Sequence, residues 1–100
     1  MTRRTRVYVA GPLSTGADYY HTCDNVKKAL AVGDELLVLG YAPYIPHLTH
    51  YWHLHYNHSW HEWMDQDRAW VLASDALIRM PGESKGADFE VDWAGQDGIP

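Results

Sequence analysis

Three short strand-like runs alternate with three longer helical patterns along this chain of 100 residues. The runs Arg6–Ala10, Tyr41–Ile45 and Asp75–Met80 are largely apolar, and proline or glycine follows each of them. The segments after them carry apolar residues at helical spacing, and residues 98–100 resemble the start of a fourth strand. A β-α-β-α-β-α order predicts a parallel sheet with right-handed crossovers and helices on both faces.

We therefore expect a single α/β domain over residues 1–100, with three layers. In such sheets, ligands bind beyond the carboxyl ends of the strands, at the point where the strand order reverses. If the order is 2-1-3-4, this point lies between the first and third strands. The loops Gly11–Gly16 and Pro81–Gly86 would then flank the binding site.

Two acidic residues occupy positions where helical spacing predicts apolar side chains. In the segment Gly86–Asp97, Glu90 falls at the centre of an apolar arc formed by Ala87, Phe89, Val91, Trp93 and Ala94. In the segment Trp60–Ser74, Asp67 falls in the middle of an arc formed by Trp60, Trp63, Met64, Trp70 and Val71. An unpaired carboxylate in apolar surroundings is costly, so each acid must be paired, neutralised or lining a cavity. Two such acids on neighbouring helices predict a carboxylate-based active site.

The loop Pro81–Gly86 precedes a helix, where backbone N–H groups gather and attract anions. Ser84 is either a hydroxyl donor for such an anion or only the helix N-cap. Tyr8, in the middle of the first strand, is either a core aromatic or the group that orients a carboxylate. Asp75, at the start of the third strand, is expected to have a structural role. The arginines Arg3, Arg4 and Arg6 are interpreted as a solvated tail.

A segment rich in histidine and tryptophan follows the second strand. Its histidines are His47, His50, His53, His55, His58 and His61. Pairs at i, i+3 spacing would fit a metal site, but no HExxH motif or cysteine partner is present. We therefore expect no metal and no cofactor, and a lid over the crevice with His47 pointing inward. The five tryptophans of the chain suggest either base stacking or a subunit interface.

Composition excludes several classes of protein. The net charge of -5 argues against a nucleic-acid polymer as partner. No stretch approaches the roughly 18 consecutive apolar residues of a membrane span, so we expect no membrane contact. Cys23 is the only cysteine, which rules out an intrachain disulfide and favours a cytoplasmic location.

Several motifs taken together resemble the nucleoside 2-deoxyribosyltransferase superfamily, above all its small bacterial and phage members. They are Tyr8–Pro12, Asp67, Asp75–Leu77 and the pattern P-G-x-S-x-G-A-x-x-E over Pro81–Glu90. The similarity extends from Tyr8 to Ile99. It implies a Rossmann-like or flavodoxin-like fold and assembly into homodimers or homotetramers.

The resemblance also implies roles for individual residues. The glutamate that matches Glu90 is the nucleophile, the tyrosine that matches Tyr8 orients it, and the aspartate that matches Asp67 helps protonate the departing base. Transferases tend to carry an aspartate six residues before the nucleophile, whereas the branch that hydrolyses nucleoside 5′-monophosphates tends to carry serine. This chain has Ser84, whose hydroxyl and neighbouring N–H groups suit a phosphate.

We therefore expect cleavage of the N-glycosidic bond of a (deoxy)nucleoside 5′-monophosphate, with release of the base and the sugar phosphate. The expected catalytic residues are Glu90, Asp67 and Tyr8, and the expected substrate-binding residues are Gly11, Pro12, His47, Gly82, Ser84 and Gly86. Asp67 is the expected acid, and His47 is its alternative. Two other functions stay open: base exchange between nucleosides, and nucleotide binding without turnover.

Overall fold

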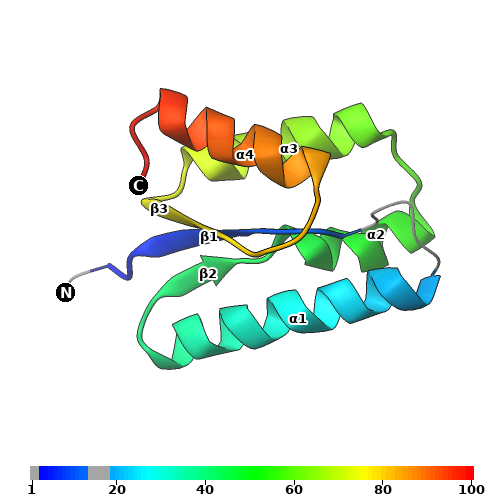
Figure 1. Ribbon diagram of the computed structural model, residues 1–100, viewed down its shortest axis with the longest axis horizontal. Helices are drawn as coiled ribbons and strands as arrows, with labels where there is room; N and C mark the ends of the chain where they lie inside the picture. Colours follow the sequence, from blue (N-terminus) through cyan, green and yellow to red (C-terminus); the bar gives the residue numbers. More distant parts are fainter. Residues whose placement is uncertain (1–2, 14–18) are drawn as a thin grey trace.

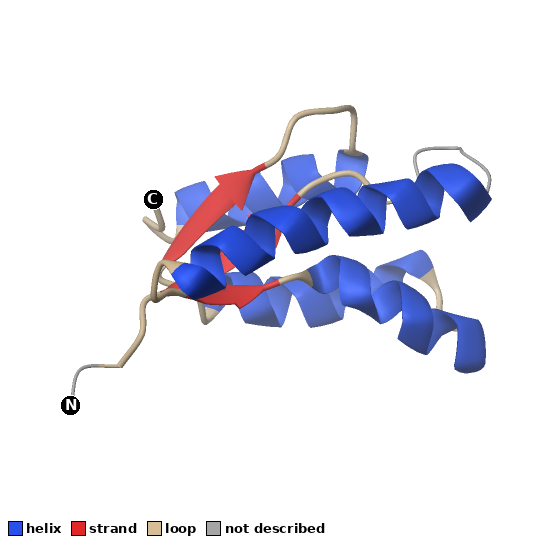
Figure 2. Cartoon of the chain, turned by 90° about the horizontal axis from the view of Figure 1, so that it is seen from below, coloured by secondary structure: helices blue, strands red, loops and turns tan. Residues whose placement is uncertain are grey.

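The computed structural model describes residues 3–13 and 19–100, which form a small α/β fold. The parallel strands are β1 (Arg6–Ala10), β2 (Ala42–Tyr44) and β3 (Ala76–Arg79), in the order β2-β1-β3. The helices are α1 (Tyr19–Val38), α2 (Thr49–His55), α3 (Trp60–Leu72) and α4 (Lys85–Gln96), with a 3-10 turn η1 (Pro46–Leu48) before α2. Helix α1 covers one face of the sheet, and α3 and α4 lie side by side over the other (Figure 1). The three strands therefore run between layers of helices (Figure 2).

The central strand β1 explains why the core has two halves. Both of its edges are hydrogen-bonded, because Tyr8 pairs with Tyr44 of β2 and with Leu77 of β3. Side chains alternate along a strand, so neighbouring residues of β1 enter opposite layers. Tyr8 packs under α3 and α4 with residues that include Val71, whereas Val9 packs with Leu36 of α1. Burial on both faces accounts for the continuous apolar run that predicts this strand.

The described part of the chain contains three strands, not the expected four. Ile99 packs against the core, and the backbone N–H of Leu77 donates to the Pro100 carbonyl oxygen at 2.8 Å. Pro100 thus lies beside β3, where the expected fourth strand would begin. The four-strand order 2-1-3-4 stays a prediction.

The helices bury narrower stripes than their apolar arcs predict. In α4 the buried residues are Ala87, Glu90 and Ala94, whereas Phe89 and Val91 are more than a third exposed. In α3 the buried residues are Met64 and Val71, whereas Trp60 and Trp70, which the arc predicts to be buried, are nearly half exposed. Each helix contacts the sheet along one line of residues at i, i+3 and i+7 spacing, so the flanks of the arc remain outside.

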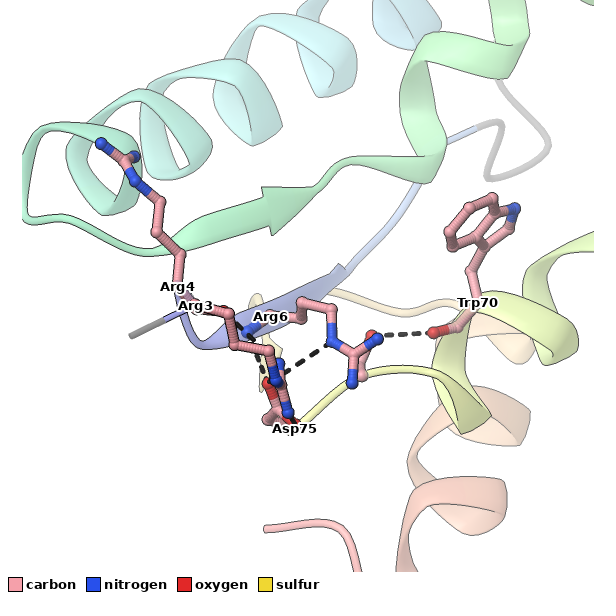
Figure 3. Close-up of polar contacts among 6 residues, drawn as sticks. Arg3, Arg4, Arg6, Trp70 and Asp75 are labelled. Atoms are coloured by element: carbon pink, nitrogen blue, oxygen red, sulfur yellow. Dashed lines mark hydrogen bonds and ion pairs between the residues drawn. The ribbon is translucent and has the colours of Figure 1, made fainter. Parts of the chain in front are cut away.

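An ion-pair cluster holds the amino ends of the strands together. The Arg3 guanidinium donates to both carboxylate oxygens of Asp75 at 2.7 and 2.8 Å, and the Arg6 backbone N–H donates to the same carboxylate at 2.8 Å (Figure 3). Arg4 donates to the Tyr41 carbonyl oxygen at 3.0 Å. The structural role expected for Asp75 is confirmed. The arginines are exposed, as expected of solvated side chains, but these contacts anchor them to the sheet, so they do not form a free tail.

Replacing Asp75 by asparagine is expected to lower stability at pH 7 much more than at pH 2. The Arg3 guanidinium, followed by the Arg6 backbone, lowers the pKa of Asp75 far below its usual range. A carboxyl group with a lowered pKa stabilises the fold above its unfolded pKa of about 4, and this contribution is lost as the pH falls through the folded value. Thermal unfolding at pH 7, 4 and 2 measures the difference, and the exposed Asp92→Asn is the control. A difference in stability between Asp75→Asn and the wild type that stays the same from pH 7 to pH 2 would contradict this role of the Asp75 carboxylate.

Candidate active site

An open cleft of about 890 Å³ lies beyond the carboxyl ends of the strands, between the first turns of α3 and α4 and the η1–α2 segment. In Figure 1 these helix ends lie on the right. Six of the predicted site residues line the cleft: Gly11, His47, Asp67, Ser84, Gly86 and Glu90. Residues that are far apart in the sequence therefore meet where the parallel topology predicts a ligand site.

Tyr8 and Glu90 form a buried hydrogen bond at the floor of the cleft. The Tyr8 hydroxyl donates to Glu90 Oε2 at 2.5 Å, and Glu90 is only 4% exposed. Burial, followed by the charges of Glu90 and Asp67, raises the pKa of Tyr8, so its phenol stays protonated. Tyr8 thus fixes one carboxylate oxygen of Glu90, and the same carboxyl group is also hydrogen-bonded to Asp67. Both readings of Tyr8 apply, since it is also part of the core.

Asp67 completes a pair of acids from neighbouring helices. It lies on α3 between the buried Met64 and Val71, and its Oδ1 atom is buried with no hydrogen-bond partner among the described residues. Burial raises the pKa of both Asp67 and Glu90 above the ordinary carboxyl range, and the charge of Asp67 raises that of Glu90 further. Two acids this close titrate as one unit, so a single shared proton is favoured near neutral pH.

His47 contributes a neutral imidazole rather than an acid. The side chain lies in η1 and is 2% exposed, and its Nε2 atom is 3.1 Å from the Pro12 carbonyl oxygen. Burial lowers the pKa of His47, so the ring is neutral and Nε2 carries the proton that it donates to Pro12. The Nδ1 atom is buried without a partner among the described residues. The alternative in which His47 protonates the base is therefore disfavoured.

Two predicted binding residues shape the cleft without lining it. Gly82 has a φ of +115°, and a Cβ atom at this position would lie 2.8 Å from Pro12 Cγ. Only glycine avoids both the backbone strain and this overlap. Neither Gly82 nor Pro12 lies among the described residues that line the cleft, so the structure gives them a packing role.

Ser84 is the N-cap of α4, and its hydroxyl oxygen accepts a hydrogen bond from the Ala87 backbone N–H at 3.1 Å. The hydroxyl proton can still be donated, because the cap uses only the oxygen. Lys85 and Gly86 also line the cleft. Their backbone N–H groups, like the first N–H groups of any helix, have no intrahelical partner and are available to a ligand. The N-cap and the anion-binding reading of Ser84 are therefore compatible.

Arg79, which the sequence analysis missed, anchors the loop before α4. Its guanidinium donates to the Met80 carbonyl oxygen, to the Gly82 carbonyl oxygen at 3.0 Å and to Asp88 Oδ1 at 3.0 Å. A strand residue thus ties together both ends of the loop that carries Ser84. A lone arginine at the end of a predicted strand gives no sequence signal for this role.

Replacing Arg79 by methionine is expected to lower the free energy of unfolding by about 1–3 kcal/mol. The aliphatic stem stays, but two carbonyl groups and Asp88 lose a charged donor. Thermal unfolding measures the loss, and hydrogen exchange locates it in residues 81–88. Arg68→Met, at a side chain that lies 5.7 Å from the centre of the Trp93 ring, is the matched control. Equal rates of hydrogen exchange for residues 81–88 in the Arg79→Met and Arg68→Met proteins would contradict this role.

The histidine-rich segment forms η1 and α2, and only part of it faces the cleft. His47, His50, His53 and His58 line the cavity, whereas His55 and His61 do not. In the described ranges, no group of three or more histidine, cysteine, aspartate or glutamate side chains is arranged to hold a metal ion. No helix in the same ranges is long and apolar enough to cross a membrane.

Residues 5–100 match the model of a family that is described as a domain of unknown function, DUF4406. The chain belongs to this family. The match spans every strand and helix of the fold, and all of the cleft residues named above lie within it. No curated protein and no solved structure matches the chain. The family description assigns no chemistry, so the functional argument rests on the geometry of the cleft.

Proposed function

We propose that this protein cleaves the N-glycosidic bond of a (deoxy)nucleoside 5′-monophosphate, releasing the base and the sugar phosphate. The observation that carries the proposal is the buried Tyr8–Glu90 hydrogen bond beside Asp67 in a ligand-sized cleft. The resemblance to the nucleoside 2-deoxyribosyltransferase superfamily supports it, because Tyr8, Asp67 and Glu90 match that superfamily's catalytic residues.

The reaction follows the logic of a retaining glycosidase. A Glu90 carboxylate oxygen attacks the anomeric carbon, and the bond from this carbon to the base nitrogen breaks. The base takes the bond electrons and a proton from Asp67. Water then attacks the glycosyl ester of Glu90, Asp67 accepts the proton of the water, and Glu90 leaves as a carboxylate.

The shared proton suits this sequence of steps. The reaction requires one ionised acid as nucleophile and one protonated acid for the departing base. The Tyr8 hydrogen bond lowers the pKa of Glu90, but burial and the neighbouring Asp67 raise it above the pKa of Asp67. The shared proton therefore lies on Glu90 in the free protein, and in this proposal it passes to Asp67 when the substrate binds. Because burial raises both pKa values, activity is expected to peak at a pH above the ordinary range of carboxyl groups.

The phosphate group is assigned to the first turn of α4. Ser84 and the N–H groups of Lys85 and Gly86 present donors without a carboxylate at the capping position. An aspartate in place of Ser84 would repel a phosphate dianion. This difference supports a monophosphate over a free nucleoside. Assembly into a homodimer or homotetramer, and a fourth strand that completes a Rossmann-like sheet, stay predictions.

The test is chromatography after incubation with a panel of nucleoside and deoxynucleoside 5′-monophosphates, and with the free nucleosides in parallel. Each is run with and without a second base, and the Glu90→Gln protein is the control. We expect free base from monophosphates only, and only when Glu90 is present. A new nucleoside formed with added base would indicate base exchange, and the absence of any product would overturn the enzymatic proposal.

A further inference from the structure

One side of the cleft is an aromatic wall, formed by His53 of α2, His58 of the α2–α3 loop, and Trp60 and Trp63 of α3. Trp60 is 47% exposed although it lines a cavity. Leaving so much indole surface in contact with water is unfavourable, and a flat ligand would cover it. The proposed reaction does not use any of these four side chains.

His53, His58 and Trp63 hold one another in place, and the Trp60 ring lies beside Phe89, with ring centroids 6.1 Å apart. The Trp63 Nε1–H donates to His53 Nδ1 at 2.8 Å, and the His58 backbone N–H donates to the same atom at 3.2 Å. The Trp63 ring also meets the rings of Trp52 and His58 edge to face, with centroids 5.1 and 5.3 Å apart. A ligand that stacks here loses little free energy to ordering the protein.

The wall adjoins the part of the cleft that suits an anion. The Lys85 ammonium lies 5.9 Å from the centre of the Trp60 ring, and Lys85 is the first residue of α4. One end of the cleft therefore offers positive charge and N–H donors, and the next surface offers indole and imidazole rings. An anionic group attached to a planar ring system matches this order.

We infer that the aromatic wall of His53, His58, Trp60 and Trp63 is the subsite for the planar heteroaromatic base of a nucleotide ligand. The inference deepens the proposed function, because the base that stacks on the wall is the group that Glu90 and Asp67 release. Trp60 supplies exposed stacking surface, and His53 is a positioning residue that orients Trp63. Stacking is tolerant of base identity, so the wall selects for the presence of a base more than for one particular base.

Calorimetric titration of the Glu90→Gln protein tests the inference without turnover. The probes are the four common ribonucleoside 5′-monophosphates and ribose 5-phosphate, which carries the phosphate but no base. In the Trp60→Leu, Glu90→Gln double variant, the tightest-binding nucleotide is expected to bind about tenfold more weakly, and ribose 5-phosphate is expected to bind as before. Trp70→Leu in the same background is the matched control, because Trp70 is 46% exposed on the same helix but lies outside the cleft.

The outcomes separate this inference from the proposed function. The inference is overturned if Trp60→Leu weakens the binding of ribose 5-phosphate and of the nucleotide equally, or weakens neither. It is also overturned if Trp70→Leu causes a similar loss of nucleotide affinity, or if the protein binds no nucleotide. Trp60-dependent nucleotide binding in a protein that never releases base would support the inference and overturn the enzymatic proposal. If a Trp60→Leu protein with Glu90 intact releases base with an unchanged KM, the enzymatic proposal is supported and the inference about the wall is overturned.

Discussion

The Glu90→Gln protein is expected to lose at least about a thousandfold in base release while remaining folded. Glutamine keeps the shape of the side chain and still accepts a hydrogen bond from Tyr8, but its amide oxygen is a poor nucleophile at the anomeric carbon. Base release from the best monophosphate of the panel measures the loss. Glu35→Gln, on the exposed surface of α1, is the control. Near wild-type release by Glu90→Gln would refute the assignment of the nucleophile.

The same substitution is expected to stabilise the protein at alkaline pH. Burial raises the pKa of Glu90 in the folded state, so the folded chain binds this proton more tightly than the unfolded chain. Stability then falls as the pH rises from the unfolded pKa of about 4 through the raised folded value, and glutamine removes this loss. Each 1 kcal/mol corresponds to roughly 4–8 °C in Tm for a domain of this size. Thermal unfolding at pH 5 and pH 8.5 should show that the Tm of Glu90→Gln exceeds that of the wild type by more at the higher pH.

The Asp67→Asn protein is expected to lose about 10²- to 10⁴-fold in base release, depending on the base. Asparagine cannot give a proton to the departing nitrogen, so poor leaving groups suffer most. A 7-methylguanosine 5′-monophosphate carries its positive charge on the base, which therefore departs as a neutral molecule without a proton. We expect Asp67→Asn to cleave this substrate nearly as fast as the wild type.

Comparison of an ordinary monophosphate with the 7-methylguanosine monophosphate distinguishes loss of the general acid from a structural disturbance of the site. Asp65→Asn, on the exposed side of the same helix, is the control and should cleave both substrates normally. The alkaline limb of the pH profile for the ordinary monophosphate should also disappear in Asp67→Asn, because it reports loss of the shared proton. An equal fall for both substrates would contradict the role of Asp67 as an acid.

The positions of the two acids could be predicted from the sequence because each interrupts a helical repeat. Glu90 lies between Ala87 and Ala94, and Asp67 lies between Met64 and Val71, with the same i, i+3, i+7 spacing. Apolar residues on both sides force the acid inward whatever the exact width of the stripe. The parallel topology then brings both acids to one end of the sheet. The width of each buried stripe could not be predicted, because it depends on how closely the neighbouring helix approaches.

Other parts of the site depend on contacts that leave no local pattern. Helix α2 was not predicted, because its residues lack an apolar stripe. It is held by contacts with α3, such as the hydrogen bond from Trp63 Nε1–H to His53. Arg79 acts through loop carbonyl groups, whose positions are known only after the loop has folded. The neutral state of His47 likewise follows from burial against Pro12 and not from residue type.

The hydrogen bond between Tyr8 and Glu90 joins residues that are 82 positions apart, from the first strand to the last helix. Closing a loop of this length costs conformational entropy, and the contact cannot form until both ends of the fold are available. During synthesis the ribosome must release the chain through α4 before the carboxylate can be oriented. Partly made or misassembled chains would therefore lack the hydrogen bond between Tyr8 and Glu90.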